Sequence, residues 1–75
     1  MRTDYVTYEE AQTLIPIFRY LEKEAPYVDL RKSAGKVLMA LKRVRSVDYA
    51  PLRGYQIILD EREHDLLKKV MDEFL

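Results

Sequence analysis

Apolar residues recur every three or four positions in three segments of this 75-residue chain, a spacing typical of amphipathic helices. The segments run from Tyr8 to Ala25, from Leu30 to Arg45, and from Glu61 nearly to the C-terminus. In chain order, the predicted apolar faces consist of Ala11, Leu14, Ile15, Phe18, Leu21 and Ala25; of Leu30, Ala34, Val37, Leu38, Leu41 and Val44; and of Leu66, Leu67, Val70, Met71 and Phe74. Three helices around one small core are therefore predicted.

Local signals indicate where these helices begin. Thr7 stands three residues before Glu10, the spacing of a capping box, and Asp60 stands in the same relation to Glu63. The second helix has Asp29 as a candidate cap. Each of the three predicted helices thus has a polar side chain to accept a hydrogen bond from its first backbone amides.

Two prolines shape the first helix. Pro16 lies inside it and cannot donate the helical hydrogen bond to the carbonyl of Gln12, so either the helix kinks or a second short helix starts there. We favour the kink. Pro26 pushes Ala25 out of helical geometry and is expected to end the segment.

Two short segments have strand character, Arg2–Val6 and Tyr55–Leu59, and each directly precedes a helix. Residues 46–54, with Pro51 and Gly54, form the longest predicted loop. The predicted fold is a small α+β domain dominated by helices, residues 1–75 in one unit, in the order β-α-α-β-α. The pattern leaves open whether the two strands pair and in which direction.

Composition excludes several classes of protein. The chain has no cysteine, which excludes a disulfide scaffold, a thiolate zinc site and a cysteine nucleophile. No apolar run approaches the roughly 18 residues of a membrane span, and the N-terminus does not resemble a signal peptide. We therefore expect a soluble protein of the cytoplasm with no membrane partner.

The formal net charge is zero, with 13 basic and 13 acidic residues, but the charges are not evenly distributed. Residues 1–30 hold three basic and six acidic side chains, and residues 54–75 hold the same numbers. Residues 31–53 hold seven basic side chains and one acidic. The middle of the chain is therefore its positive region.

An exposed methionine surrounded by cations is the most suggestive feature of the predicted second helix. The side chains opposite its apolar face are Arg31, Lys32, Lys36, Lys42 and Arg43, with Met39 among them. Cations attract an acidic partner, and methionine supplies an adaptable apolar contact, so this face is a candidate binding surface. The alternative is that these cations are solvated and partly paired with acidic residues of the flanking helices.

A larger protein with an acidic or mixed surface fits this face best, because the overall charge balance and the acidic flanks disfavour a polyanion. A nucleic acid bound by the basic face of the second helix is the alternative partner. Short strands with an open edge could also pair with a second copy of the chain, so a homodimer is a further possibility.

The predicted loop is a second candidate contact surface. It carries Tyr49, Leu52 and Arg53, and tyrosine and arginine are enriched at the energetic centres of protein interfaces.

No motif predicts catalysis or a bound cofactor. The only histidine, His64, follows Glu61 at the spacing used by di-iron helices, but the chain has no second such motif, so we predict no metal site. Neither Ser33 nor Ser46 lies in a nucleophile motif, and the two glycines are too far apart to form a phosphate loop. We expect a protein that is not an enzyme and needs no cofactor.

These observations together favour a non-enzymatic protein-binding module. Small proteins of this kind are often regulators or inhibitors, including ones encoded by phages and other mobile elements. The alternatives are a nucleic-acid-binding protein and a small homo-oligomeric structural subunit.

Overall fold

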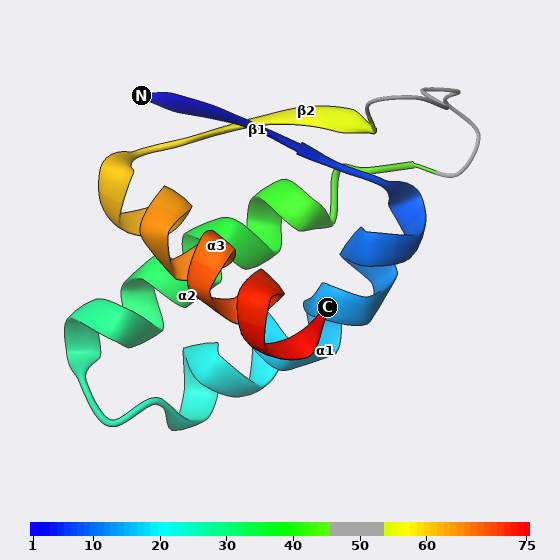
Figure 1. The fold of residues 1–75 in the computed structure, drawn as a ribbon. Coiled ribbons are helices and arrows are strands. Elements are labelled where there is room, and N and C mark those ends of the chain that lie inside the picture. The colour runs from blue at the N-terminus through cyan, green and yellow to red at the C-terminus, as the bar shows by residue number, and fades with distance from the viewer. Residues whose placement is uncertain (46–53) are drawn as a thin grey trace.

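The computed structural model describes residues 1–45 and 54–75 of the chain. Within them the elements are β1 (Arg2–Val6), α1 (Tyr8–Glu24), α2 (Val28–Leu41), β2 (Tyr55–Leu59) and α3 (Glu61–Phe74). The two strands lie together over one side of the three helices (Figure 1). The predicted helix-dominated α+β fold and its β-α-α-β-α order are confirmed.

Both predicted capping pairs form reciprocal capping boxes. The backbone N–H of Glu10 donates to Thr7 Oγ1 at 3.1 Å, and the backbone N–H of Thr7 donates to the Glu10 carboxylate at 2.9 Å. The backbone N–H of Glu63 donates to Asp60 Oδ1 at 2.8 Å, and that of Asp60 donates to the Glu63 carboxylate at 3.3 Å. Each box satisfies amides that would otherwise lack partners, so α1 and α3 begin at the positions that the sequence specifies.

The bounds predicted for the second helix are wrong at both ends. The helix begins at Val28 rather than Leu30, because the N–H of Arg31 donates to the carbonyl of Tyr27 at 3.0 Å and makes Tyr27, not Asp29, the cap residue. It ends at Leu41 rather than Arg45. After Leu41 the backbone turns more tightly, as the N–H of residue 43 bonds the carbonyl of residue 40 and that of residue 44 bonds the carbonyl of residue 41.

α1 is a single helix that continues through Pro16, so the chain does not break and restart there. Pro16 is exposed, which leaves the carbonyl four residues earlier on the solvent side of the helix. The helix ends at Glu24, and Ala25 has the extended backbone expected before Pro26.

β1 and β2 pair antiparallel, in a register that sets Arg2 opposite Leu59 and Val6 opposite Tyr55. One face of the sheet points toward the helices and carries Val6, Ile57 and Leu59 together with Asp4. On the other face Tyr5 and Ile58 are about half exposed, at 51% and 57%. Strand alternation therefore leaves the outer face of the sheet uncovered by any described element.

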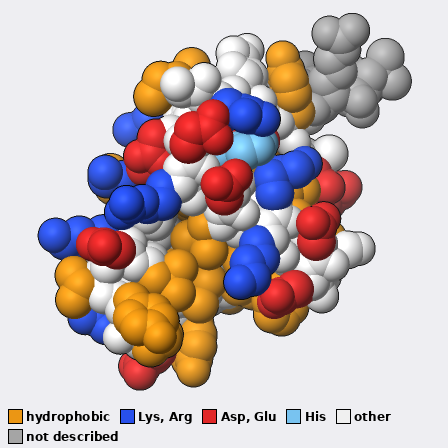
Figure 2. Space-filling model, turned by 60° about the vertical axis from the view of Figure 1, so that its left-hand side comes forward, with side chains coloured by type: hydrophobic (Ala, Val, Ile, Leu, Met, Phe, Trp, Pro, Cys, Tyr) orange, Lys and Arg blue, Asp and Glu red, His pale blue; other side chains and the backbone are white. Residues whose placement is uncertain are grey.

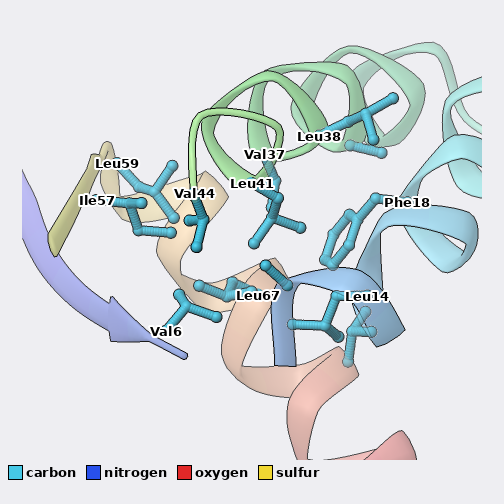
Figure 3. Close-up of a cluster of buried hydrophobic side chains, with 13 residues drawn as sticks. Val6, Leu14, Phe18, Val37, Leu38, Leu41, Val44, Ile57, Leu59 and Leu67 are labelled. Carbon is cyan, nitrogen blue, oxygen red and sulfur yellow. The ribbon is translucent and has the colours of Figure 1, made fainter. Parts of the chain in front are cut away.

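The core is an apolar cluster between the sheet and the helices, to which every described element contributes. Figure 3 shows side chains from β1 and β2 meeting those of α1, α2 and α3. The largest fully buried side chains are Phe18, Leu14, Leu41, Leu59, Leu67, Val6 and Val37. Val44 is also buried although it lies beyond the end of α2, so the predicted apolar face keeps its role in the core after the helix has stopped.

Two residues of the predicted apolar faces are not in the core. Leu30 of α2 is only partly buried and does not belong to the core cluster. Phe74, at the end of α3, is 58% exposed, and the neighbouring Leu75 is 55% exposed. Neither side chain belongs to the core cluster, so they do not attach the C-terminal tail to the core. Among the described residues, no helix has the length and apolar character needed to cross a membrane.

Gly54 is required by the backbone at the entrance to β2. Its φ of +77° lies in the left-handed region, and an added Cβ would lie 2.6 Å from the carbonyl carbon of Val6. A glycine here lets β2 begin alongside the end of β1.

Candidate functional site

Four of the predicted binding residues lie together around one groove on the surface of α1 and α2. The groove has a volume of about 520 Å³. Its lining consists of Glu22 from α1 and of Val28, Arg31, Lys32, Gly35, Lys36 and Met39 from α2. Met39 is 60% exposed and Val28 is 54% exposed, so the groove presents apolar groups between cations. We call these seven residues the α1–α2 groove.

The cations of this groove differ in how they are held. The Arg31 guanidinium donates a hydrogen bond to the carbonyl of Ala25 at 2.7 Å, which fixes the arginine over the turn between α1 and α2. Lys36 Nζ lies 3.8 Å from the Glu63 carboxylate of α3. Lys32 is exposed and forms no ion pair within residues 1–45 and 54–75. The predicted partial pairing with flanking acids therefore holds for Lys36 and leaves Lys32 available to a partner.

Glu22 brings a negative charge into the groove. Its carboxylate packs against Gly35, where a Cβ would lie 2.6 Å from Glu22 Oε2. The groove is thus basic at one side and acidic where α1 borders it. A mixed surface of this kind differs from the uniformly positive surface that nucleic-acid backbones select.

The remaining two predicted helix residues lie elsewhere. Lys42 is the C-cap residue that directly follows α2, and it does not line the groove. Arg43 lies beyond the helix and lines a separate hollow of about 230 Å³ with Ala40 and with residues 56–58 of β2. Because the helix ends at Leu41, the single continuous face predicted from the helical wheel is divided into a groove and a hollow. Tyr49, Leu52 and Arg53 of the predicted loop lie outside the described residues.

A third hollow lies between α2 and α3. It has a volume of about 410 Å³ and is lined by Tyr27, Asp29, Leu30, Ser33, Arg62 and Leu66. Figure 2 shows hydrophobic side chains gathered in the lower half of this side of the molecule, with charged side chains around them. Arg62 and Asp29 lie 3.8 Å apart across the hollow and are both exposed, so this ion pair is a weak link between the helices. This hollow could not be predicted from the sequence, because its lining comes from two helices that are far apart along the chain.

A largely buried pair of titratable side chains, Asp4 of β1 and His64 of α3, was not predicted from the sequence. His64 Nδ1 lies 2.8 and 2.9 Å from the two carboxylate oxygens of Asp4. The side chains are 9% and 14% exposed. An ionised carboxylate only accepts hydrogen bonds, so Nδ1 carries the proton and donates it toward Asp4.

The pair of Asp4 and His64 has a structural function, because it joins a strand to a helix. It connects β1 to α3 across 60 residues of sequence, and it satisfies a carboxylate that strand alternation turns toward the core. One signal in the sequence could have indicated this pair. Asp4 lies two residues before Val6, so strand alternation places both side chains on the inward face, where a carboxylate needs a hydrogen-bond donor. No group of three or more histidine, aspartate and glutamate side chains is placed to hold a metal ion within residues 1–45 and 54–75.

The cap of α3 also affects the electrostatics of Asp60. The backbone N–H of Glu63 donates to the Asp60 carboxylate and holds the pKa of Asp60 below its ordinary value of 3.8. Glu63 itself is 7% exposed because its carboxylate faces the cap and Lys36. The N-terminus of α3 is thereby connected to α2.

Comparisons with known proteins identify no relative: no protein-family model, curated protein or solved structure matches this chain.

Proposed function

We propose that this protein is a non-enzymatic protein-binding module, a small regulator or inhibitor that binds an acidic or mixed surface of a larger protein through the α1–α2 groove. The observation that carries the proposal is the exposed apolar pair Val28 and Met39, set among Arg31, Lys32 and Lys36 in one groove. Cytoplasmic location stays a prediction from the composition.

The chemistry of the groove favours a protein partner that has an apolar group beside a carboxylate. Met39 is a flexible, polarisable side chain that adapts to the shape of an apolar group. The ammonium group of Lys32 is available for a charge-assisted bond to an aspartate or glutamate. Apolar burial provides most of the affinity in such an interface, and the cation contributes orientation and association rate.

Nucleic acid is disfavoured as the partner for three reasons. The carboxylate of Glu22 borders the groove and would repel phosphates, Lys36 lies near the carboxylate of Glu63, and Arg31 is occupied by the carbonyl of Ala25. Few cations therefore remain to replace the counterions of a phosphate backbone.

The test uses substitutions that remove binding groups without removing structural contacts. Lys32→Glu and Met39→Ser change exposed side chains of the groove, whereas Arg31 and Lys36 are left in place because they contact other parts of the fold. The matched control is Lys69→Glu with Phe74→Ser, which makes the same kinds of change at exposed positions of α3.

The unmodified chain and each variant are immobilised and exposed to a lysate of the cell that produces the protein, with and without nuclease treatment. We expect the unmodified chain and the α3 control to retain the same partner and the groove variant to lose it. Equal capture by all three chains would show that the groove is not the contact surface. Capture that nuclease abolishes would instead support the nucleic-acid alternative.

A further inference from the structure

The outer edge of β2 is a second place where a partner can bind. The described sheet has two strands, β1 and β2, so the edge of β2 that faces away from β1 has no strand beside it within residues 1–45 and 54–75. All five residues of β2 pair with β1 in an uninterrupted register. From Gln56 to Leu59 such an edge presents backbone N–H and C=O groups to an added strand.

The composition of β2 does not protect this edge. Natural edge strands commonly carry lysine, proline or a bulge that prevents further pairing. The strand Tyr55–Leu59 reads Tyr-Gln-Ile-Ile-Leu, with no charged residue and no proline. β1, by contrast, carries Arg2 and Asp4. Of the two edges, that of β2 is the better suited to pairing with another strand.

The hollow that Arg43 lines is located at this edge. Its lining includes the successive strand residues Gln56, Ile57 and Ile58, and successive side chains in a strand point to opposite faces. A hollow that touches all three must therefore extend around the edge of the strand. No residue of β1 lines it, so it lies at the outer edge, with Ala40 and Arg43 of the α2 end on its far side.

We infer that this edge binds an extended acidic segment of a protein partner, which adds a third strand to the sheet. On the side facing the helices, an apolar residue of the segment occupies the hollow beside Ala40 and Ile57. The residue two positions along the segment points the same way and is an aspartate or glutamate that binds Arg43. Main-chain hydrogen bonds to β2 give affinity, and the two side chains give selectivity.

Charge selects this occupant over a second copy of the chain. Arg43 is exposed and forms no ion pair with any acidic side chain of the described residues. Two copies paired through β2 about a twofold axis would bring their Arg43 side chains to the same interface, where like charges repel. An acidic segment supplies the opposite charge. The edge shares no residue with the α1–α2 groove, so binding at the two surfaces can be measured separately.

The test titrates peptides into the full chain, labelled with ¹⁵N, and follows its amide signals by NMR. The probe is the blocked peptide Thr-Val-Thr-Val-Thr-Glu-Thr, and its matched control has Lys in place of Glu. We expect the acidic peptide to shift the signals of Gln56–Leu59 saturably and to bind about tenfold more tightly than the lysine peptide, the difference typical of one charge-assisted contact. In the Arg43→Glu variant the preference between the peptides should reverse.

Two further changes separate the role of the hollow from that of the backbone. Ala40→Leu fills the hollow without a change of charge and should weaken binding of the acidic peptide about tenfold, by excluding its apolar residue. Two further peptides carry N-methyl groups on alternate backbone amides, the odd positions in one peptide and the even positions in the other. Their affinities should differ, because only one of these two sets of amides faces β2. If Ala40→Leu does not fold, Arg43→Glu and the methylated peptides still decide the question.

Three results would overturn the inference. The first is that neither peptide moves the signals of Gln56–Leu59, or that both bind equally to every chain. The second is that the acidic peptide shifts the signals of the α1–α2 groove instead, which would support the proposed function while excluding the edge. The third is that dilution alone shifts the β2 signals, which would show that a second copy occupies the edge.

Discussion

The largely buried pair of Asp4 and His64 should contribute more to stability than the surface ion pairs formed within residues 1–45 and 54–75. The change to test is Asp4→Ala, which leaves His64 Nδ1 without its acceptor at a side chain that is 14% exposed. A hydrogen bond to a charged group contributes about 1.5–3 kcal/mol, so we expect a loss of about 2 kcal/mol in the free energy of unfolding. For a domain of this size that corresponds to a fall of about 8–16 °C in Tm.

A double-mutant cycle isolates the interaction from other effects of the substitutions. The free energies of unfolding of the native chain, Asp4→Ala, His64→Ala and the double variant are measured by urea denaturation, and the coupling energy should be about 1–2 kcal/mol. The matched control is the pair Arg2 and Glu61, which joins the same two elements at 3.2 Å with side chains that are 50% and 66% exposed. Its coupling energy should be below about 0.5 kcal/mol, because solvent screens the charges.

The reasoning is refuted if the coupling energy of Asp4 with His64 is no larger than that of Arg2 with Glu61. Equal values would mean that burial at the junction of β1 and α3 does not strengthen the pair. Asp4→Asn provides a further check, since its amide oxygen can still accept the Nδ1 proton and should preserve part of the stability that Asp4→Ala loses.

Three further predictions concern the backbone and the helix caps. Gly54→Ala should destabilise the protein by more than about 1 kcal/mol, because the residue has a positive φ and its Cβ would overlap the backbone of Val6; an unchanged urea midpoint would contradict this. Gly35→Ala should stabilise α2 by up to about 1 kcal/mol, because the atom it would meet is the end of the exposed, flexible Glu22 side chain; a lower midpoint would mean that Glu22 cannot move aside. The lowered pKa of Asp60 should make its contribution to stability pH-dependent: it is present above the unfolded value of 3.8 and is lost as the pH falls through the lower folded value. Between about pH 5 and pH 2, the advantage of the native chain over Asp60→Asn, which caps without titrating, should therefore decrease, and a constant difference would exclude this linkage.

Features that depend on neighbouring residues in the sequence could be predicted. Thr7 and Asp60 each need only a glutamate three positions later to form their caps, and both did so. The helical spacing of apolar residues identified every residue of the core cluster that lies outside the two strands, because a helix buries whichever face is apolar. Phe74 departs from this rule, since periodicity gives the direction of a side chain but not whether another element covers it.

The candidate site could be predicted only in part. The cations around Met39 were found from the helical wheel, and four of the six helix residues do surround one groove. The helical wheel was drawn for a helix that continues to Arg45, and on it Lys42 and Arg43 share the face of Met39. Because the backbone turns more tightly after Leu41, Arg43 lies beside β2 instead of on the exposed face of α2. The next residue, Val44, is buried in the core.

By itself, the sequence determined the elements, their order and the apolar face of each helix, because these depend on side-chain periodicity and on hydrogen bonds between residues three or four positions apart. The tertiary structure alone decided the antiparallel pairing of β1 with β2, the burial of Asp4 against His64, and the location of the grooves beside α2. These features join residues as far as 60 positions apart, and they arise only when the elements pack around a common core. Packing also places Arg31 against the carbonyl of Ala25 and Lys36 near the carboxylate of Glu63. Lys32 and Arg43 form no ion pair within residues 1–45 and 54–75 and can bind an acidic group of a partner.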